Sequence, residues 1–446
     1  MNWDIIFSVD NKVDLSLVEI SKQLGLSVDV VNKSLKYLVK HELFKKELIY
    51  KTKNWDRNSY KATVKLTRDL LHVIEVKNLP QIKLVQNLLR QDNKQNSRKT
   101  KNHNLTIPNR LLLIILLCHS DKYGVVGDLS LTKLANIFGG TKSSVSSRII
   151  LLKKRDYIRT YISGVSGKNI FKRSTSIIIL NLKHNAFGQD AAQGLTILLS
   201  SINIGSNVSE AVEMYSVANF LLNPKNKKFT SLEHIWQFEN NLSRLYFTDS
   251  RDEFRHIVPF FNEPSFRLKM QSFLQVKINQ YASILLSIYW SELINKESVY
   301  DKSLKSIILK DTLGELHHPR ADENIFPNNK SVNLLVKFIF DAADFLAKRL
   351  QAQLTKLEKY SPSTMDYIIF PSVEPLRRNI AIESFYKDAE PYKRNRIIQI
   401  NVNYALPEQT TVNMVKHLTK EDEYRYGLLS KVEPKIIKVD DKNKQI

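Results

Sequence analysis

The strongest pattern of apolar and polar positions runs from Ile107 to Leu182. It starts with the apolar run Leu111 to Cys118 after Pro108. A proline is tolerated in the first turn of a helix, so this run predicts a buried helix. Apolar residues spaced three and four apart then predict a short second helix, for which Asp128 and Ser130 offer capping oxygens. Its apolar stripe consists of Leu131, Leu134, Ala135 and Phe138.

A third helix is expected after Gly139-Gly140, with Thr141 as its cap. It is small, polar and basic at its start, and Ile149 to Leu152 then turn inward. Small hydroxyl side chains permit close approach to DNA, lysine supplies charge and an arginine fork can read guanine. These properties are typical of a recognition helix, and the alternative is a helical hairpin with a solvated serine face. The polar stretch reads Lys142, Ser143, Ser144, Val145, Ser146, Ser147, Arg148.

Two β-rich segments follow this helix. Tyr157 to Ile162 alternates as a strand, and Thr175 to Leu182 is a second run of β-forming residues. The loop between them carries Lys168, Lys172 and Arg173 at its tip. Three helices followed by a hairpin predict a winged helix, with the hairpin as the wing.

A similar pattern occurs near the start of the chain. Val13 to Leu24 predicts a helix capped by Asp14 or Ser16, Gly25 ends it, and Ser27 caps a second helix over Val28 to Lys40. The outward positions of this second helix are Asp29, Asn32, Lys33, Lys36 and Lys40.

A hairpin is predicted here too. Its strands are Leu43 to Lys51 and Tyr60 to Leu66, joined by a turn over 54–58. Arg57 lies in this turn, and Lys53 directly precedes it. The chain is therefore expected to contain two copies of one unit.

Both units resemble the winged helix-turn-helix domains of bacterial regulators such as the MarR and GntR families, and the tandem pair looks like plasmid replication initiators. The resemblance covers roughly residues 12–70 and 107–183 and rests on pattern. It implies that the second helix of each unit reads the major groove and that the wing touches backbone or minor groove.

The rest of the chain reads as mostly helical, with predicted helices over 191–202, 209–222, 231–247, 251–260, 266–294 and 332–360. Ser361 to Pro375 is predicted to be irregular, Arg396 to Tyr404 to be a strand, and the tail from Glu421 to be mobile. The expected fold class is mainly α with small β-hairpin wings. The expected domains are two winged helices (1–78 and 107–186) joined by a helix and basic linker (79–106), a helical interaction or dimerisation domain (187–420) and the tail (421–446).

Positive charge is concentrated in the first part of the chain. The net charge is +22, and residues 1–200 hold 33 Lys and Arg against 15 Asp and Glu, a net of +18. A module that binds polyanions concentrates charge in this way, so double-stranded DNA is the expected partner. The longest apolar stretches fall short of the roughly 18 residues that a membrane span needs, and no membrane partner is expected.

Enzymatic chemistry has no visible signature. Phosphate-binding glycine loops are absent from the sequence, and a single cysteine, Cys118, excludes a disulfide framework and favours the reducing cytoplasm. His317-His318 with Asp322 and Glu323 could suggest a metal, but a solvated loop is the favoured interpretation. Asp341 and Asp344 are interpreted as an exposed acidic helix face. No catalytic residue, metal or cofactor is therefore predicted.

The sequence thus predicts a non-enzymatic, sequence-specific DNA-binding protein of the cytoplasm, associated with the nucleoid. Transcriptional regulation is the first choice, and a homodimer through the helical domain is possible. The predicted DNA-binding residues are Ser27, Asn32, Lys33, Lys36, Lys40, Lys53, Arg57, Thr141, Lys142, Ser143, Ser144, Ser147, Arg148, Lys168, Lys172 and Arg173.

Three alternatives remain open. A replication or partition factor of a mobile element would also pair winged helices, and only the arrangement of its DNA sites would distinguish it. An assembly component could use the same helices for protein contacts. An enzyme would need an active site within residues 190–446 that the spacing does not reveal.

Overall fold

The fold is described from a computed structural model. The residues described are 12–13, 16–24, 28–40, 44–51, 56–62, 80–90, 105–167, 169–171, 174–201, 209–222, 256–262, 267–295, 301–314, 330–371, 379–386, 396–402, 409–426 and 428. The chain divides into two compact units. The first comprises Met1–Val126, Leu134–Arg148 and His184–Ala191, and the second Gly127–Lys133, Ile149–Lys183 and Ala192–Ile446. The domain boundaries expected from the sequence stay predictions.

The expected fold class is wrong. The protein is mixed α/β, with a five-stranded mixed sheet packed against helices and a three-stranded antiparallel sheet, rather than helical domains with small wings. The error has a physical cause. Strands that are buried on both faces carry continuous apolar runs, so they lack the alternation that identifies a half-exposed strand.

The start of the first unit contains the three-stranded sheet, in which β3 (Asp56–Ala62) lies between β1 (Lys12–Val13) and β2 (Phe44–Lys51). Helices α2 (Leu17–Leu24) and α3 (Val28–Lys40) accompany it. Ser16 caps α2: its Oγ accepts from the Glu19 amide at 3.2 Å, and the Ser16 amide donates to the Glu19 carboxylate at 2.7 Å. Because β3 begins at Asp56, the predicted turn over 54–58 is partly strand.

A second group of elements in this unit comprises α5 (Ile82–Arg90), α6 (Ile107–Cys118), most of α7 (Leu131–Phe138), the first half of α8 (Lys142–Lys154) and the 3-10 helix η2 (Asn185–Asp190). Helix α5 packs on α6 and η2. The predicted buried helix after Pro108 is therefore present, and its buried leucines form a core with residues of α5 and α8. The buried residues of this group include Leu84, Leu88, Leu112, Leu113, Leu116, Leu117 and Val145.

The second unit is built on the five-stranded sheet, whose order is β11-β10-β7-β9-β8. The strands are β7 (Gly194–Ser201), β8 (Met365–Ile369), β9 (Asn379–Tyr386), β10 (Arg396–Val402) and β11 (Thr411–Val415). Central strand β7 pairs parallel with β10 and antiparallel with β9, and the outer pairs are antiparallel. The hairpin of β5 (Ile158–Ile162) and β6 (Ile177–Leu180) also belongs to this unit.

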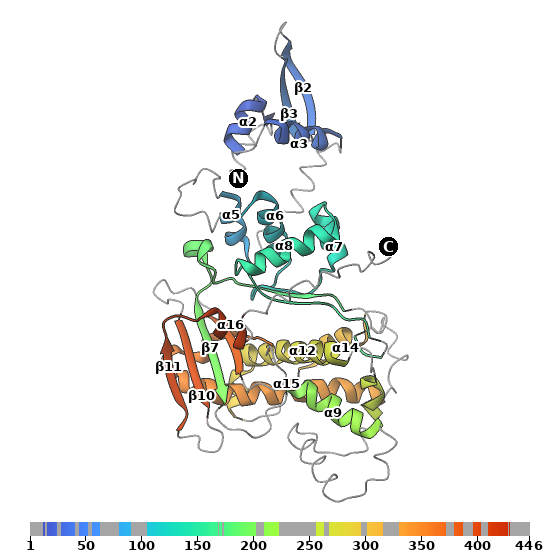
Figure 1. The fold of residues 1–446 in the computed structure, drawn as a ribbon, viewed down its shortest axis with the longest axis vertical. Coiled ribbons are helices and arrows are strands. Elements are labelled where there is room, and N and C mark those ends of the chain that lie inside the picture. The colour runs from blue at the N-terminus through green and yellow to red at the C-terminus, as the bar shows by residue number, and fades with distance from the viewer. Residues whose placement is uncertain are drawn as a thin grey trace, which may run out of the picture. The chain divides into compact units, whose positions relative to one another are not determined.

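Helices pack beside this sheet (Figure 1). They are α9 (Glu210–Leu222), α12 (Arg267–Ile288), α13 (Trp290–Ile294), α14 (Lys302–Leu313) and α15 (Lys330–Leu354), together with the 3-10 helices η4 (Val258–Phe261), η7 (Thr355–Tyr360) and η8 (Pro362–Thr364). Helix α12 contacts α9, α15 and β8, so it forms the centre of this layer. No helix among the described residues is long and apolar enough to span a membrane.

Helix α12 closes the outer edge of β8 with hydroxyl groups. Ser283 Oγ accepts from the Ile369 amide and Ser287 Oγ from the Tyr367 amide, both at 2.9 Å. Each hydroxyl donates in turn to a carbonyl one helical turn earlier, Asn279 O and Ser283 O, at 2.7 Å. Two edge amides that would otherwise be buried without partners are therefore satisfied.

Ser283→Ala should lower the free energy of unfolding by about 1–3 kcal/mol, because it leaves the Ile369 amide buried without an acceptor. Urea unfolding followed by far-UV circular dichroism measures the change. Ser306→Ala, at an exposed position of α14, is the matched control and should change stability by less than about 0.5 kcal/mol. Equal losses in both variants would contradict the role assigned to the Ser283 hydroxyl.

The helices predicted over 209–222, 266–294 and 332–360 are present, although 266–294 is divided at Tyr289 and the last segment ends in η7. Two other predictions are wrong: 191–202 contains β7 instead of a helix, and 361–375, predicted irregular, contains β8. The pattern also missed β9 and β11, and the tail expected to be mobile begins with helix α16 (Lys420–Arg425). The helix predicted over 231–247 lies outside the described residues.

Candidate nucleic-acid interface

The helix pair α7 and α8, of which residues 134–138 and 142–148 belong to the first unit, carries the candidate interface. The tight connection between them depends on Gly139, which adopts a left-handed backbone with φ +72°. Thr141 caps α8, since its Oγ1 accepts from the Ser144 amide at 3.2 Å. Ser130 caps α7 in the same way, accepting from the Lys133 amide at 3.1 Å. Both caps agree with the sequence pattern.

The first two turns of α8 present a polar face. Lys142, Ser143 and Ser147 are exposed and Ser144 is half-buried, whereas Val145 on the opposite side is fully buried. The exposed side thus combines a cation with small hydroxyl side chains at the positive end of a helix dipole. Such a surface suits an anion that must approach closely, such as a phosphate backbone.

Arg148 points toward other helices of the unit. Its Nη1 donates to Asn109 Oδ1 at 3.0 Å, and its guanidinium lies over the Phe138 ring at 5.4 Å from the centroid. Asn109 is itself buried in α6. In the structure this side chain therefore links α8 to α6 and α7, and reading a base would require it to give up these contacts.

Arg148→Ala should lower the free energy of unfolding of the first unit by about 1–3 kcal/mol, because it removes a partly buried hydrogen bond and a cation–π contact. Urea unfolding measures this loss. Lys154→Ala, which removes an exposed charge at the other end of α8, should have little effect. A stable Arg148→Ala variant would show that these contacts contribute nothing.

Helix α3 offers a second basic face. Lys33, Lys36 and Lys40 are exposed, and Asn32 is half-buried. Lys33 forms an ion pair with Asp29 at 2.8 Å, which is highly exposed and therefore weak. Arg57 lies on β3, and the remaining predicted residues, Ser27, Lys53, Lys168, Lys172 and Arg173, lie outside the described residues.

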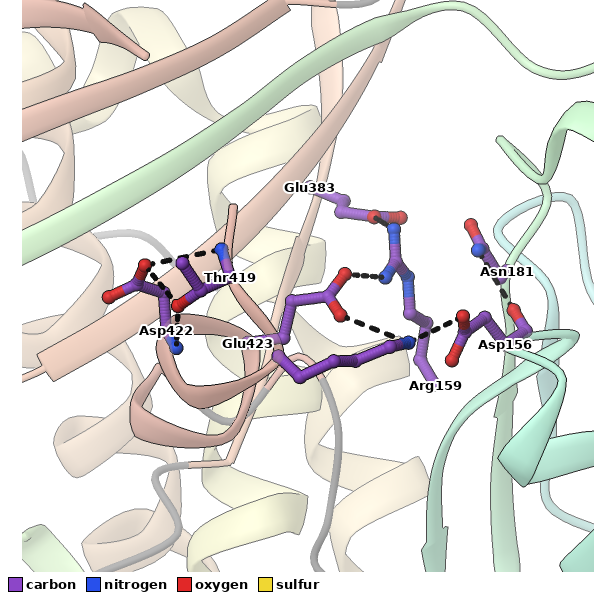
Figure 2. A network of polar contacts seen from close by, with 8 residues as sticks. Asp156, Arg159, Asn181, Glu383, Thr419, Asp422 and Glu423 are labelled. Atoms are coloured by element: carbon purple, nitrogen blue, oxygen red, sulfur yellow. Dashed lines mark hydrogen bonds and ion pairs between the residues drawn. The ribbon is translucent and has the colours of Figure 1, made fainter. Parts of the chain in front are cut away.

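A charged network lies in the second unit (Figure 2). The Arg159 guanidinium on β5 lies 3.3 Å from Glu383 of β9 and 3.3 Å from Glu423 of α16. Lys420 of α16 pairs with Asp156 at 2.6 Å and with Glu423 at 3.4 Å. The Glu383 side chain is only 1% exposed, so solvent cannot replace the Arg159 guanidinium as its partner.

Lys183 extends this network into the interior. Its Nζ donates to Leu195 O at 2.8 Å and lies 5.0 Å from the centre of the Phe385 ring. Burial lowers the pKa of Lys183 to about 8, although the nearby Glu383 carboxylate opposes this effect. The sequence pattern did not indicate this network, because Arg159 and Glu423 are 264 positions apart.

Metal chemistry has no candidate centre among the described residues, where no group of three or more His, Cys, Asp or Glu side chains could hold an ion. The segment with His317, His318, Asp322 and Glu323 lies outside them. Asp341 and Asp344 lie on α15, half-buried, and burial raises the pKa of Asp341 to about 6.

No family model, curated protein or solved structure matches the chain.

Proposed function

We propose that the protein binds double-stranded DNA through the first two turns of α8 and acts as a cytoplasmic transcriptional regulator. The observation that carries the proposal is the capped start of α8, where Lys142, Ser143 and Ser147 are exposed after a tight glycine turn. The excess of positive charge in residues 1–200 supports it.

The contacts divide into two kinds. Lys142 and the free amides at the start of α8 would hold phosphate oxygens, because the helix dipole and the ammonium group both favour an anion there. Ser143 and Ser147 lie one turn apart on the exposed side, and their short hydroxyl side chains would approach base edges. Exposed lysines on α3 would add phosphate contacts that do not depend on sequence.

Lys142→Ala should weaken binding to every duplex and reduce the slope of log K against log salt by about one, because one phosphate contact is lost. Fluorescence anisotropy with a labelled duplex between about 50 and 200 mM salt measures both quantities. Lys302→Ala removes an exposed lysine from α14 and should leave the slope unchanged.

Selection of DNA sites from a random library by the purified chain tests specificity. The proposal would be supported if the selected sites share a DNA sequence motif and if a duplex with that motif slows hydrogen exchange of the α8 amides. If the chain shows no affinity for DNA at low salt, or the same loss in the Lys142 and Lys302 variants, α8 is not the DNA-binding element.

A further inference from the structure

We propose that α16 is an intramolecular competitor of DNA: it pairs with Asp156 and Arg159 of the basic segment Lys153–Arg159, and phosphate groups displace it. This inference rests on the proposed DNA binding and adds a form of regulation to it. It concerns the end of α8 and the start of β5, both in the second unit.

The segment Lys153–Arg159 is strongly basic. Lys153, Lys154, Arg155 and Arg159 occur within seven residues that contain one acidic side chain, Asp156. Lys154 is exposed, and the other three basic side chains are half-buried. The segment joins α8 to β5 through Asp156, whose backbone adopts a left-handed conformation with φ +62°. It therefore continues directly from the helix to which DNA binding is assigned.

Helix α16 complements this charge. Its sequence, Lys-Glu-Asp-Glu-Tyr-Arg, places Glu421, Asp422 and Glu423 in the first turn. Asp422 is used locally: its amide donates to Thr419 Oγ1 at 3.1 Å, and its carboxylate accepts from the Thr419 amide at 3.2 Å (Figure 2). Glu421 is exposed. Within the part of the chain that the structure describes, Glu423 is the one of these three carboxylates that forms an ion pair with the segment.

Ion pairs fasten α16 to the segment. No residue of α16 is buried, so the helix contributes no apolar side chain to the core. Its links to the segment are Glu423 to Arg159 and Lys420 to Asp156, and the Lys420 side chain is 57% exposed. The Lys420–Asp156 pair is partly exposed and therefore weak and screened by salt, whereas the side chains of the Arg159–Glu423 pair are only 11% and 17% exposed.

Buried side chains and hydrogen bonds, rather than ion pairs, hold the residues just after α16. Tyr426 and Leu428 are buried, and the Tyr426 hydroxyl lies 2.5 Å from Ser200 Oγ and 3.2 Å from Gln399 Nε2. The segment that follows the helix therefore stays on the sheet when the ion pairs break. Release of α16 breaks the Glu423–Arg159 and Lys420–Asp156 pairs and leaves the contacts of Tyr426 in place.

A phosphate group can replace Glu423. The Glu423 carboxylate takes one edge of the Arg159 guanidinium while Glu383 takes another, as Figure 2 shows. Phosphate oxygens bind arginine with the same charge-assisted geometry. A phosphate on Arg159 and a carboxylate of α16 thus compete for the same Nη1 donor.

Two charge-matched variants on α16 test this competition. Glu423→Gln removes the carboxylate that pairs with Arg159, and Glu421→Gln removes an exposed carboxylate two residues away. We expect Glu423→Gln to tighten binding of a 20-base-pair duplex by about 3- to 10-fold at low salt, against less than 2-fold for Glu421→Gln. In wild type, adding the duplex should speed amide hydrogen exchange across α16.

The outcomes separate the two proposals. If wild type binds the duplex and Lys142→Ala weakens binding, but the two α16 variants bind alike, the competition is wrong and the DNA-binding proposal stands. Slower exchange of α16 on adding duplex would overturn the competition as well. If wild type binds no duplex, both proposals fail. Unchanged circular dichroism of Glu423→Gln confirms that its fold is intact.

Discussion

Arg159→Met should lower the free energy of unfolding of the second unit by about 3–5 kcal/mol, because it leaves Glu383 as a buried carboxylate that has lost its Arg159 partner. Glu423 loses the same partner, although its side chain is more exposed (17%). The nearby Lys183 compensates only in part, since its own pKa is lowered by burial. Urea unfolding of the full chain measures the loss.

The double variant Arg159→Met with Glu383→Gln provides the control. Since it removes both charges, it should be more stable than Arg159→Met alone, and the double-mutant cycle gives the coupling energy. If the stability losses of Arg159→Met and Glu383→Gln simply add in the double variant, Arg159 contributes through the packing of its aliphatic stem and its charge is unimportant.

Gly194→Ala should lower the free energy of unfolding by about 3 kcal/mol, near the upper end of what overpacking usually costs. A Cβ at this position meets the carbonyl oxygen and carbonyl carbon of Ser384 in the paired strand β9, closer than any normal contact. Both atoms belong to the backbone, so relief requires β7 and β9 to separate at this end. Thermal unfolding and hydrogen exchange of β9 amides would detect both effects.

Gly127→Ala is the matched control, because a Cβ there finds no atom within 4 Å and the residue does not adopt a positive φ. It should be neutral or stabilising by a few tenths of a kcal/mol, since alanine restricts the unfolded chain. If Gly194→Ala proves as stable as Gly127→Ala, the close approach of β7 and β9 is not a constraint on the sequence.

Local signals predicted the elements of the first unit well. Caps at Ser16, Ser130 and Thr141 and the glycine pair at 139–140 define helix starts and a turn through contacts within four residues. The five-stranded sheet gave no such signal. The apolar core of residues 194–201, Leu195 and Ile197 to Leu199, fits a buried strand or a buried helix equally well, and β7 pairs with residues 179 to 201 positions away.

In the candidate sites too, local features could be predicted from the sequence and long-range contacts could not. The exposed start of α8 follows from helix periodicity, which the sequence contains. The inward direction of Arg148 depends on Asn109, 39 positions earlier, and could not be read from α8 alone. The network around Arg159 joins β5, β9, α16 and the turn residue Asp156, and in the sequence its members are ordinary charged residues in a chain rich in them.

The serine hydroxyls along α12 have a consequence beyond stability. Open sheets aggregate when a bare strand edge recruits strands from other molecules, and the Tyr367 and Ile369 amides of β8 would be two of the donors for such recruitment. Here a helix of the same chain already occupies those donors. Intermolecular strand addition at β8 would first have to displace Ser283 and Ser287, so this edge is protected against growth into fibrils.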